Sequence, residues 1–291
     1  MTIDFAGFLL VECLNALSEA ALLFFLGVGL TLIFGIMRVV NFAHGTLFML
    51  GAFVGYTAAQ VSGSFWVALL VAPLVVAALG ALFELGLLRR LYRRDDSAFL
   101  MVTFGLALAL GEAARLLWGN NPLSFSPPPS LRGIVFLLDQ PFPIYRLFLI
   151  VFAAAVAVAL WQFLVRTRLG LLIRATAQIP EMVQATGTDI GLVRLAVFAI
   201  GCGLAGLGGV LAAPLLTATL SLAATTIIDA FVIVIIGGMG SFTGSLVASL
   251  LVGFVQVFGE YYLPDFALAS TYLLMLLVLI TRPRGLLGHA A

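Results

Sequence analysis

The polar segment Gly35–Gly45 is the part of this chain whose residue types could bind a small solute. It interrupts two apolar stretches and contains Asn41 and His44, whose side chains can both donate and accept hydrogen bonds. Its two end glycines permit sharp backbone bends. Interrupted membrane helices leave backbone groups free, and transporters commonly build substrate sites there. Two interpretations remain open: a substrate path at Asn41, His44 and Gly45, or an ordinary interhelical loop with a satisfied histidine.

Charged side chains inside apolar stretches are the second set of candidates. Glu12 and Glu19 are seven residues apart and so share one face of a helix. Glu112 and Arg115 are three apart and can form a structural ion pair. An ionisable group within a membrane is a functional candidate by default, and we assign Glu19 to the substrate path because it lies further inside its apolar stretch than Glu12.

Enzymatic chemistry finds little support in the residues. An embedded enzyme needs a nucleophile with a base, or a set of metal ligands. The chain has two histidines, His44 and His289, and no His-Glu-x-x-His or Gly-x-Ser-x-Gly motif. We therefore expect a protein that is not an enzyme and has no catalytic residues and no metal site.

The segment 166–191 separates two strong apolar stretches and carries several turn and charge signals. Pro180 suits the first turn of a short helix over 180–186, Glu181 suits its positive start, and Gly187 suits its end. A short amphipathic helix of this kind could dock into a groove on a partner protein. The alternative is a plain cytoplasmic loop.

The composition predicts the kind of fold that positions these segments. Of the 291 residues, 63% are hydrophobic and 9% are charged, whereas a soluble domain carries roughly 25% charged residues. Lipid must therefore cover the surface, and helices satisfy the backbone there. We predict an all-α polytopic membrane helix bundle, a single domain over 1–291, with eight or nine segments. The predicted spans are 10–37, 44–61, 65–87, 97–118, 145–165, 193–213, 227–259 and 266–282.

Arginine placement predicts the orientation, because cytoplasmic loops carry the excess of positive charge. Three clusters should face the cytoplasm: Arg89, Arg90, Arg93 and Arg94; Arg166, Arg168 and Arg174; Arg282 and Arg284. Eight simple spans would leave the last cluster on the wrong side. The glycine-rich sequence 237–241 can break the 227–259 segment and add a crossing, with the N-terminus outside if there are nine. The turn-rich 119–143 segment is predicted to be an extracytoplasmic loop.

All 14 basic residues are arginine, and the chain contains no lysine. A Walker A phosphate loop ends in Gly-Lys-Ser/Thr, so this chain contains none. If transport consumes ATP, another polypeptide must bind it. The net charge of +1 leaves no large basic face for nucleic acid.

Several of these segments resemble one known family. The sequence over 29–45, the Ala185-Thr186-Gly187 motif, the run 234–241 and the ending 282–288 resemble, in order, branched-chain amino acid permeases of ATP-binding cassette (ABC) importers, LivH type. The likeness covers nearly the whole chain. It implies an ABC importer permease architecture in a bacterial inner membrane and transport by alternating access.

The resemblance also implies an assembly. A second, homologous permease of the LivM type, two cytoplasmic ATPase subunits and a periplasmic or lipid-anchored solute-binding protein would complete the importer. This chain would carry no cofactor, and ATP and Mg²⁺ would bind to the ATPases. The segment 175–187 would be the coupling contact, with the residues Ala177, Glu181, Met182, Ala185 and Gly187. Ile179-Pro180 departs from the family pattern, which often has an acidic or amide residue and no proline there.

The resemblance constrains the type of transporter more than it constrains the transported solute. Relatives of the family serve other amino acids, amides, urea and aromatic acids besides leucine, isoleucine and valine. A path with few fixed charges suits a zwitterion or a neutral solute. A stand-alone secondary transporter or channel for such a solute is the alternative, with Glu12 and Glu19 as proton-coupling groups.

Overall fold

The computed structural model describes residues 5–92 and 95–288, and it is mostly α-helical. Arg93, Arg94 and His289 therefore lie outside the described residues. The long helices are α1 (Phe5–Met37), α2 (His44–Ser62), α3 (Phe65–Gly86), α4 (Asp96–Trp118), α5 (Ile144–Arg166), α8 (Ile190–Leu216), α9 (Leu222–Gly237), α10 (Phe242–Tyr262) and α11 (Ala267–Thr281). Two short helices, α6 (Arg168–Gln178) and α7 (Pro180–Ala185), lie between α5 and α8.

Six helices among the described residues are long and apolar enough to cross a membrane: α1, α3, α4, α5, α8 and α10. The 222–237 and 269–281 helices are apolar but shorter. The described chain thus forms a multi-pass helix bundle, while the total of eight or nine segments stays a prediction.

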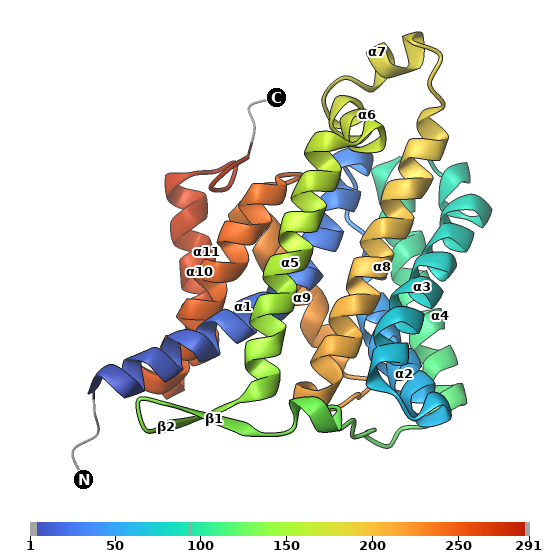
Figure 1. Cartoon of the computed structure of the whole chain (residues 1–291). Helices are drawn as coiled ribbons and strands as arrows, with labels where there is room; N and C mark the ends of the chain where they lie inside the picture. Colours follow the sequence, from blue (N-terminus) through green and yellow to red (C-terminus); the bar gives the residue numbers. More distant parts are fainter. Residues whose placement is uncertain (1–4, 93–94, 289–291) are drawn as a thin grey trace.

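The helices form one bundle with two distinct ends (Figure 1). At one end lie α6, α7 and the C-terminal segment. The described cluster arginines belong to α6, to the last residue of α5 or to the residues that follow α3 and α11: Arg89, Arg90, Arg166, Arg168, Arg174, Arg282 and Arg284. We call this end of the bundle the arginine-rich end. The opposite end holds the start of α1 and the hairpin of β1 (Ile134–Leu137) and β2 (Gln140–Pro143). The 119–143 segment, predicted as a loop, therefore contains an antiparallel hairpin.

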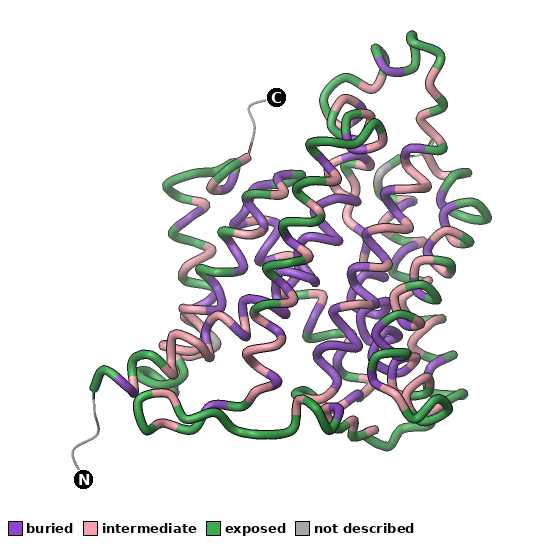
Figure 2. Tube along the Cα trace, in the orientation of Figure 1, coloured by how far each residue is buried: buried purple, intermediate pink, exposed green. Residues whose placement is uncertain are grey.

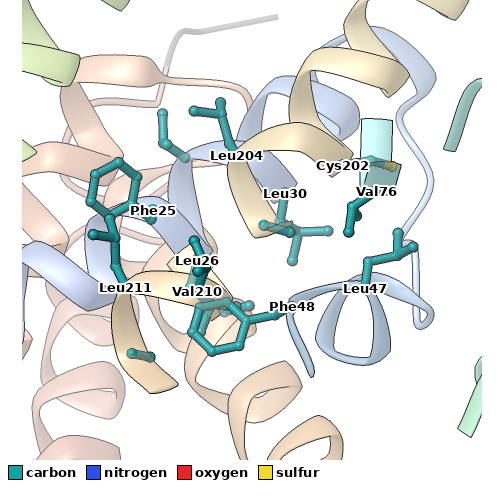
Figure 3. Packing of buried hydrophobic residues seen from close by; sticks show 14 of the residues in the cluster. Phe25, Leu26, Leu30, Leu47, Phe48, Val76, Cys202, Leu204, Val210 and Leu211 are labelled. Carbon is teal, nitrogen blue, oxygen red and sulfur yellow. The ribbon is translucent and has the colours of Figure 1, made fainter. Parts of the chain in front are cut away.

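Burial is greatest where α1, α2, α8 and α9 meet (Figure 2). In Figure 3, Phe25 and Leu26 of α1, Phe48 of α2 and Val210 and Leu211 of α8 gather in the core of this contact. The outer helices α4, α5 and α11 instead expose large apolar side chains such as Met101, Val151 and Leu277. A helix that is apolar all round is typical of a lipid-covered bundle.

Glycines allow the central helices to approach each other closely. A Cβ atom on Gly51 of α2 would collide with the backbone of Gly206 of α8, and one on Gly209 would collide with the backbone at Phe48. Small residues permit such close contacts between membrane helices. These glycines therefore serve close packing between α2 and α8.

The segment predicted as one interrupted span over 227–259 is two helices, α9 and α10, joined by the turn 238–241. The first helix also begins earlier than predicted, at Leu222, and within it Thr226 donates its hydroxyl to the carbonyl oxygen of Leu222 at 2.6 Å. Gly238 and Gly240 take left-handed φ angles of 97° and 82° in this turn, which glycine adopts without strain.

Candidate functional site

The interruption predicted between two apolar stretches is present as residues 38–43, between the end of α1 and the start of α2. Arg38 reverses the chain with a left-handed φ of 54°. Nearby, a Cβ atom on Gly35 would lie 3.2 Å from the Cα atom of Gly240. The C-terminal end of α1 therefore lies against the turn between α9 and α10. We call residues 38–45 the helix break.

Asn41 turns the chain into α2. Its Oδ1 atom accepts a hydrogen bond from the backbone N–H of Ala43 at 3.1 Å, an interaction by which asparagine stabilises a turn. The side chain is completely buried, and its Nδ2 group has no hydrogen-bond partner within the described chain.

His44, the first residue of α2, is also completely buried. Its Nε2 atom lies 3.0 Å from the carbonyl oxygen of Leu26 in α1. A carbonyl oxygen can only accept, so Nε2 carries the proton and Nδ1 is left as an acceptor. No partner for Nδ1 is found in the described residues. The helix break thus holds an unused donor on Asn41 and an unused acceptor on His44.

Neighbouring helices enclose the helix break. A Cβ atom on Gly45 would collide with the carbonyl oxygen of Ala223 and lie 2.8 Å from Cβ of Ile227, both in α9. The ring of Phe42 packs edge-on against Phe104 of α4 and Phe231 of α9, with centroid distances of 6.2 and 5.4 Å. In this conformation, packed helices therefore enclose Asn41, His44 and Gly45.

Glu19 occupies a different place. It lies seven residues before Leu26, about 10 Å along the helix axis. Its electrostatic neighbours are Arg146 and Glu260, and Asp229 of α9 also interacts with it. The structure therefore brings Asn41, His44 and Gly45 together and places Glu19 in a separate charged cluster.

The segment 166–191, which we call the coupling segment after its predicted role, contains two short helices, α6 and α7. The hydroxyl of Thr167 accepts from the backbone N–H of Gly170 at 3.0 Å and caps α6. Pro180 occupies the first turn of α7, and Gly187 follows it with a φ of 82°. The short helix predicted at 180–186 is confirmed, one residue shorter than expected.

Exposure differs between the faces of α7. Met182 is 68% exposed and Ile179, just before the helix, is 52% exposed, whereas Val183 is buried. Glu181, Ala185 and Gly187 are also exposed. The apolar surface at Ile179 and Met182 is available to a partner at the arginine-rich end. Ala177 lies on α6, where its carbonyl oxygen accepts a hydrogen bond from Arg38 at 3.5 Å. This bond links the coupling segment to the helix break.

One polar cluster was missed by the sequence argument. Glu84 of α3 is completely buried, and its Oε1 atom accepts a hydrogen bond from the hydroxyl of Tyr92 at 2.8 Å. Arg194 of α8 stacks on the Tyr92 ring. Burial, followed by the hydrogen bond to Glu84, raises the pKa of Tyr92 above its ordinary value. Glu84 could have been selected from the sequence, since it is the only ionisable residue in the predicted span 65–87.

Of two cavities in the described chain, the smaller is lined in part by Val39 of the helix break. One, of about 550 Å³, lies between the α2–α3 turn and the 124–132 segment, and the other, of about 80 Å³, lies beside Tyr92 and Arg194. Among residues 5–92 and 95–288, no three His, Cys, Asp or Glu side chains are placed to hold a metal ion.

Comparisons with known proteins agree with this arrangement. Residues 13–281 match the protein family described as branched-chain amino acid transport system / permease component. The chain is 28% identical over 305 residues to the high-affinity branched-chain amino acid transport system permease protein BraD of Pseudomonas aeruginosa, covering 96% of each chain. It is 24% identical over 303 residues to the permease protein LivH of Salmonella typhimurium, covering 97% of this chain and 96% of that protein.

The fold has a counterpart among solved structures. The structure described as PsaBC from Streptococcus pneumoniae in complex with Fab aligns with a TM-score of 0.50 at 14% identity. The alignment covers 93% of this chain and 91% of that chain. At this identity the similarity extends to the fold alone.

Proposed function

Since this chain belongs to the family of permease components of branched-chain amino acid transport systems, we propose that it imports branched-chain or related amino acids as the membrane subunit of an ABC importer. The observation that carries this proposal is the family match over residues 13–281, nearly the whole bundle. The closed helix break and the exposed coupling helix supply two parts that such a machine needs.

We propose nine crossings, with the N-terminus outside and the arginine-rich end in the cytoplasm. Long helices run from one end of the bundle to the other (Figure 1), and the turn 238–241 lies beside Gly35, near the C-terminal end of α1. With α2, α9 and α11 counted as crossings besides the six longer apolar helices, the clustered arginines all face the cytoplasm. A bacterial inner membrane fits this orientation.

The proposed assembly contains a second permease of the LivM type, two ATPase subunits that bind ATP and Mg²⁺, and a periplasmic or lipid-anchored solute-binding protein. The ATPase contact is the coupling segment, through Ala177, Glu181, Met182, Ala185 and Gly187. Support comes from the apolar surface that α7 leaves exposed at the arginine-rich end. ATP binding would move this segment, and the Arg38–Ala177 bond would carry the motion to the helix break.

The proposed path runs past the helix break. Asn41 Nδ2 is a free donor that suits a carboxylate, and His44 Nδ1 is a free acceptor that suits an ammonium group. A zwitterionic amino acid carries both. The buried unpaired groups are costly in the closed conformation, and separation of α2 from α9 would let a solute satisfy them.

The test is reconstitution of the chain with its second permease, ATPases and binding protein, followed by measurement of ATP-dependent uptake of labelled leucine with competing solutes. We expect uptake that requires every component and is competed by valine and isoleucine. ATP-dependent uptake of a different solute would support an ABC importer but assign it another substrate. Uptake by this chain alone, without ATP, would contradict the proposal and favour a secondary transporter.

A further inference from the structure

The Glu84–Tyr92–Arg194 cluster joins three segments that the proposed mechanism has not yet used. Glu84 lies in α3, Tyr92 follows the 3₁₀ turn after α3, and Arg194 lies in the second turn of α8. The Tyr92 hydroxyl donates to Glu84 at 2.8 Å, and the Arg194 guanidinium carbon lies 4.5 Å from the centre of the Tyr92 ring. Tyr92 therefore connects a buried carboxylate with a cation from another helix.

The cluster is incompletely satisfied. Glu84 Oε2 and Arg194 Nε are both buried, and neither has a hydrogen-bond partner within the described chain. Stacking on an aromatic face stabilises an arginine but provides no hydrogen-bond acceptor in the ring plane. Buried polar groups without partners cost free energy. A rearrangement that supplies Arg194 with a carboxylate partner would lower that cost.

Space for such a rearrangement lies beside Arg194. The cavity of about 80 Å³ is bounded by Tyr92 and Arg194, by Asp95, and by Met37 and Val39 after α1. This is room for water molecules or for movement of the guanidinium group. Asp95 is exposed and presents a second carboxylate on the wall of the same cavity. Arg194 and Asp95 therefore line one cavity, and Arg194 stacks on the tyrosine that donates a hydrogen bond to Glu84.

Arg194 lies close in sequence to α7, the helix proposed to contact the ATPases. It lies nine residues after Ala185, the end of α7, and five after Asp189, which caps α8 by accepting from the Gly191 N–H at 2.7 Å. Asp189 also lies 3.9 Å from Arg89, beside the end of α3. Movement of α7 can therefore reach the start of α8 along the chain, and there Arg194 stacks on Tyr92, which donates a hydrogen bond to Glu84 of α3.

We propose that Arg194 is a positioning residue that couples α7 to α3, stacking on Tyr92 in the present conformation and pairing with Asp95 when the ATPases pull on α7. The proposal rests on the proposed function, because it assumes an ATP-driven partner at α7. It adds that the force enters the bundle through the Glu84–Tyr92–Arg194 cluster as well as through Arg38.

The experiment uses the complete importer reconstituted in vesicles and measures leucine uptake and ATP hydrolysis in the same preparation. Arg194→Gln should reduce the uptake per ATP hydrolysed by roughly fivefold or more while hydrolysis continues. Tyr92→Phe keeps the ring and removes the hydroxyl donor to Glu84, so it should reduce the same ratio by less. Arg194→Lys keeps the charge without the planar group and should restore the ratio in part. Arg282→Gln removes an exposed arginine from the same end of the bundle and should leave the ratio unchanged.

The readout separates coupling from stability. If uptake and hydrolysis fall together in Arg194→Gln, with a lower melting temperature, the cluster only holds the fold and the proposal is overturned. An unchanged ratio in both Arg194→Gln and Tyr92→Phe would overturn it as well, even if the glutamine variant folds poorly. A wild-type importer without ATP-dependent uptake would overturn the proposed function itself, and the coupling role with it.

Discussion

The helix break and α7, the two parts assigned a role in the proposed importer, are built in opposite ways. Around the break, Asn41 and His44 are completely buried, and Gly45 approaches the backbone of α9 too closely to admit a Cβ atom. On α7, Met182 is 68% exposed, and Val183 is the one buried side chain of the six-residue helix. The break is held by tertiary packing, whereas α7 is held chiefly by its own turn and by the segments on either side.

This difference predicts how each region responds to change. A closely packed region loses stability when a side chain is enlarged or a hydrogen bond is removed. An exposed helix tolerates substitution in the isolated chain and shows its role only with a partner. Substitutions in the packed contact should therefore alter unfolding, and substitutions on the exposed face of α7 should alter assembly.

The largest effect is expected where α2 and α8 touch. Gly51→Ala places a Cβ atom against the backbone of Gly206, so the two helices must separate along the contact. We expect the free energy of unfolding to fall by about 1–3 kcal/mol, the usual cost of overpacking. Chemical unfolding in mixed micelles, followed by circular dichroism, would measure it.

Gly105→Ala in α4 is the matched control. No atom lies within 4 Å of its added Cβ, and the residue is exposed and helical. Its free energy of unfolding should stay unchanged or rise by about 0.4–1 kcal/mol, since alanine restricts the unfolded chain. Equal losses in the two variants would show that close helix contact is not what holds the centre of the bundle.

A smaller effect is expected at His44. His44→Leu removes the hydrogen bond to the carbonyl oxygen of Leu26 and should lower the free energy of unfolding by about 1 kcal/mol. Thr281→Val is the control, because that hydroxyl bonds to carbonyl oxygens of its own helix at an exposed position. The same unfolding titration measures both. A His44→Leu protein as stable as wild type would mean that the helix break does not depend on this bond.

How far sequence alone predicts the fold depends on what ends each element. The predicted spans 44–61, 65–87, 97–118 and 145–165 agree with α2, α3, α4 and α5 to within one or two residues, because charged and turn-forming residues end each apolar run. The β1–β2 hairpin was not predicted. Its strands have four residues each, too short to show a clear alternation.

In the candidate site too, features that are local in sequence could be predicted, and contacts between distant residues could not. Asn41, His44 and Gly45 are neighbours in sequence, so the helix break could be predicted from the chain. The contact of Gly45 with α9 and the stacking of Arg194 on Tyr92 join residues far apart in sequence. Such pairs arise from tertiary packing, and no local pattern specifies them. Glu84 could have been selected as an isolated buried carboxylate, but not with its partner.

The smallest effect on the isolated chain, and the sharpest contrast with the helix break, is expected at α7. Met182→Ala removes an exposed side chain, so the free energy of unfolding should change by less than about 0.5 kcal/mol. Binding of the purified permease pair to its ATPases should nevertheless weaken by at least about fivefold, because an exposed apolar side chain in a docking contact becomes buried on assembly. Val183→Ala, at the next residue, should have the opposite effects. It should lower the free energy of unfolding through lost packing and change binding to the ATPases little. Unfolding titrations and binding isotherms on both variants would measure the two quantities. If Met182→Ala binds the ATPases as wild type does, the exposed face of α7 is not the coupling contact.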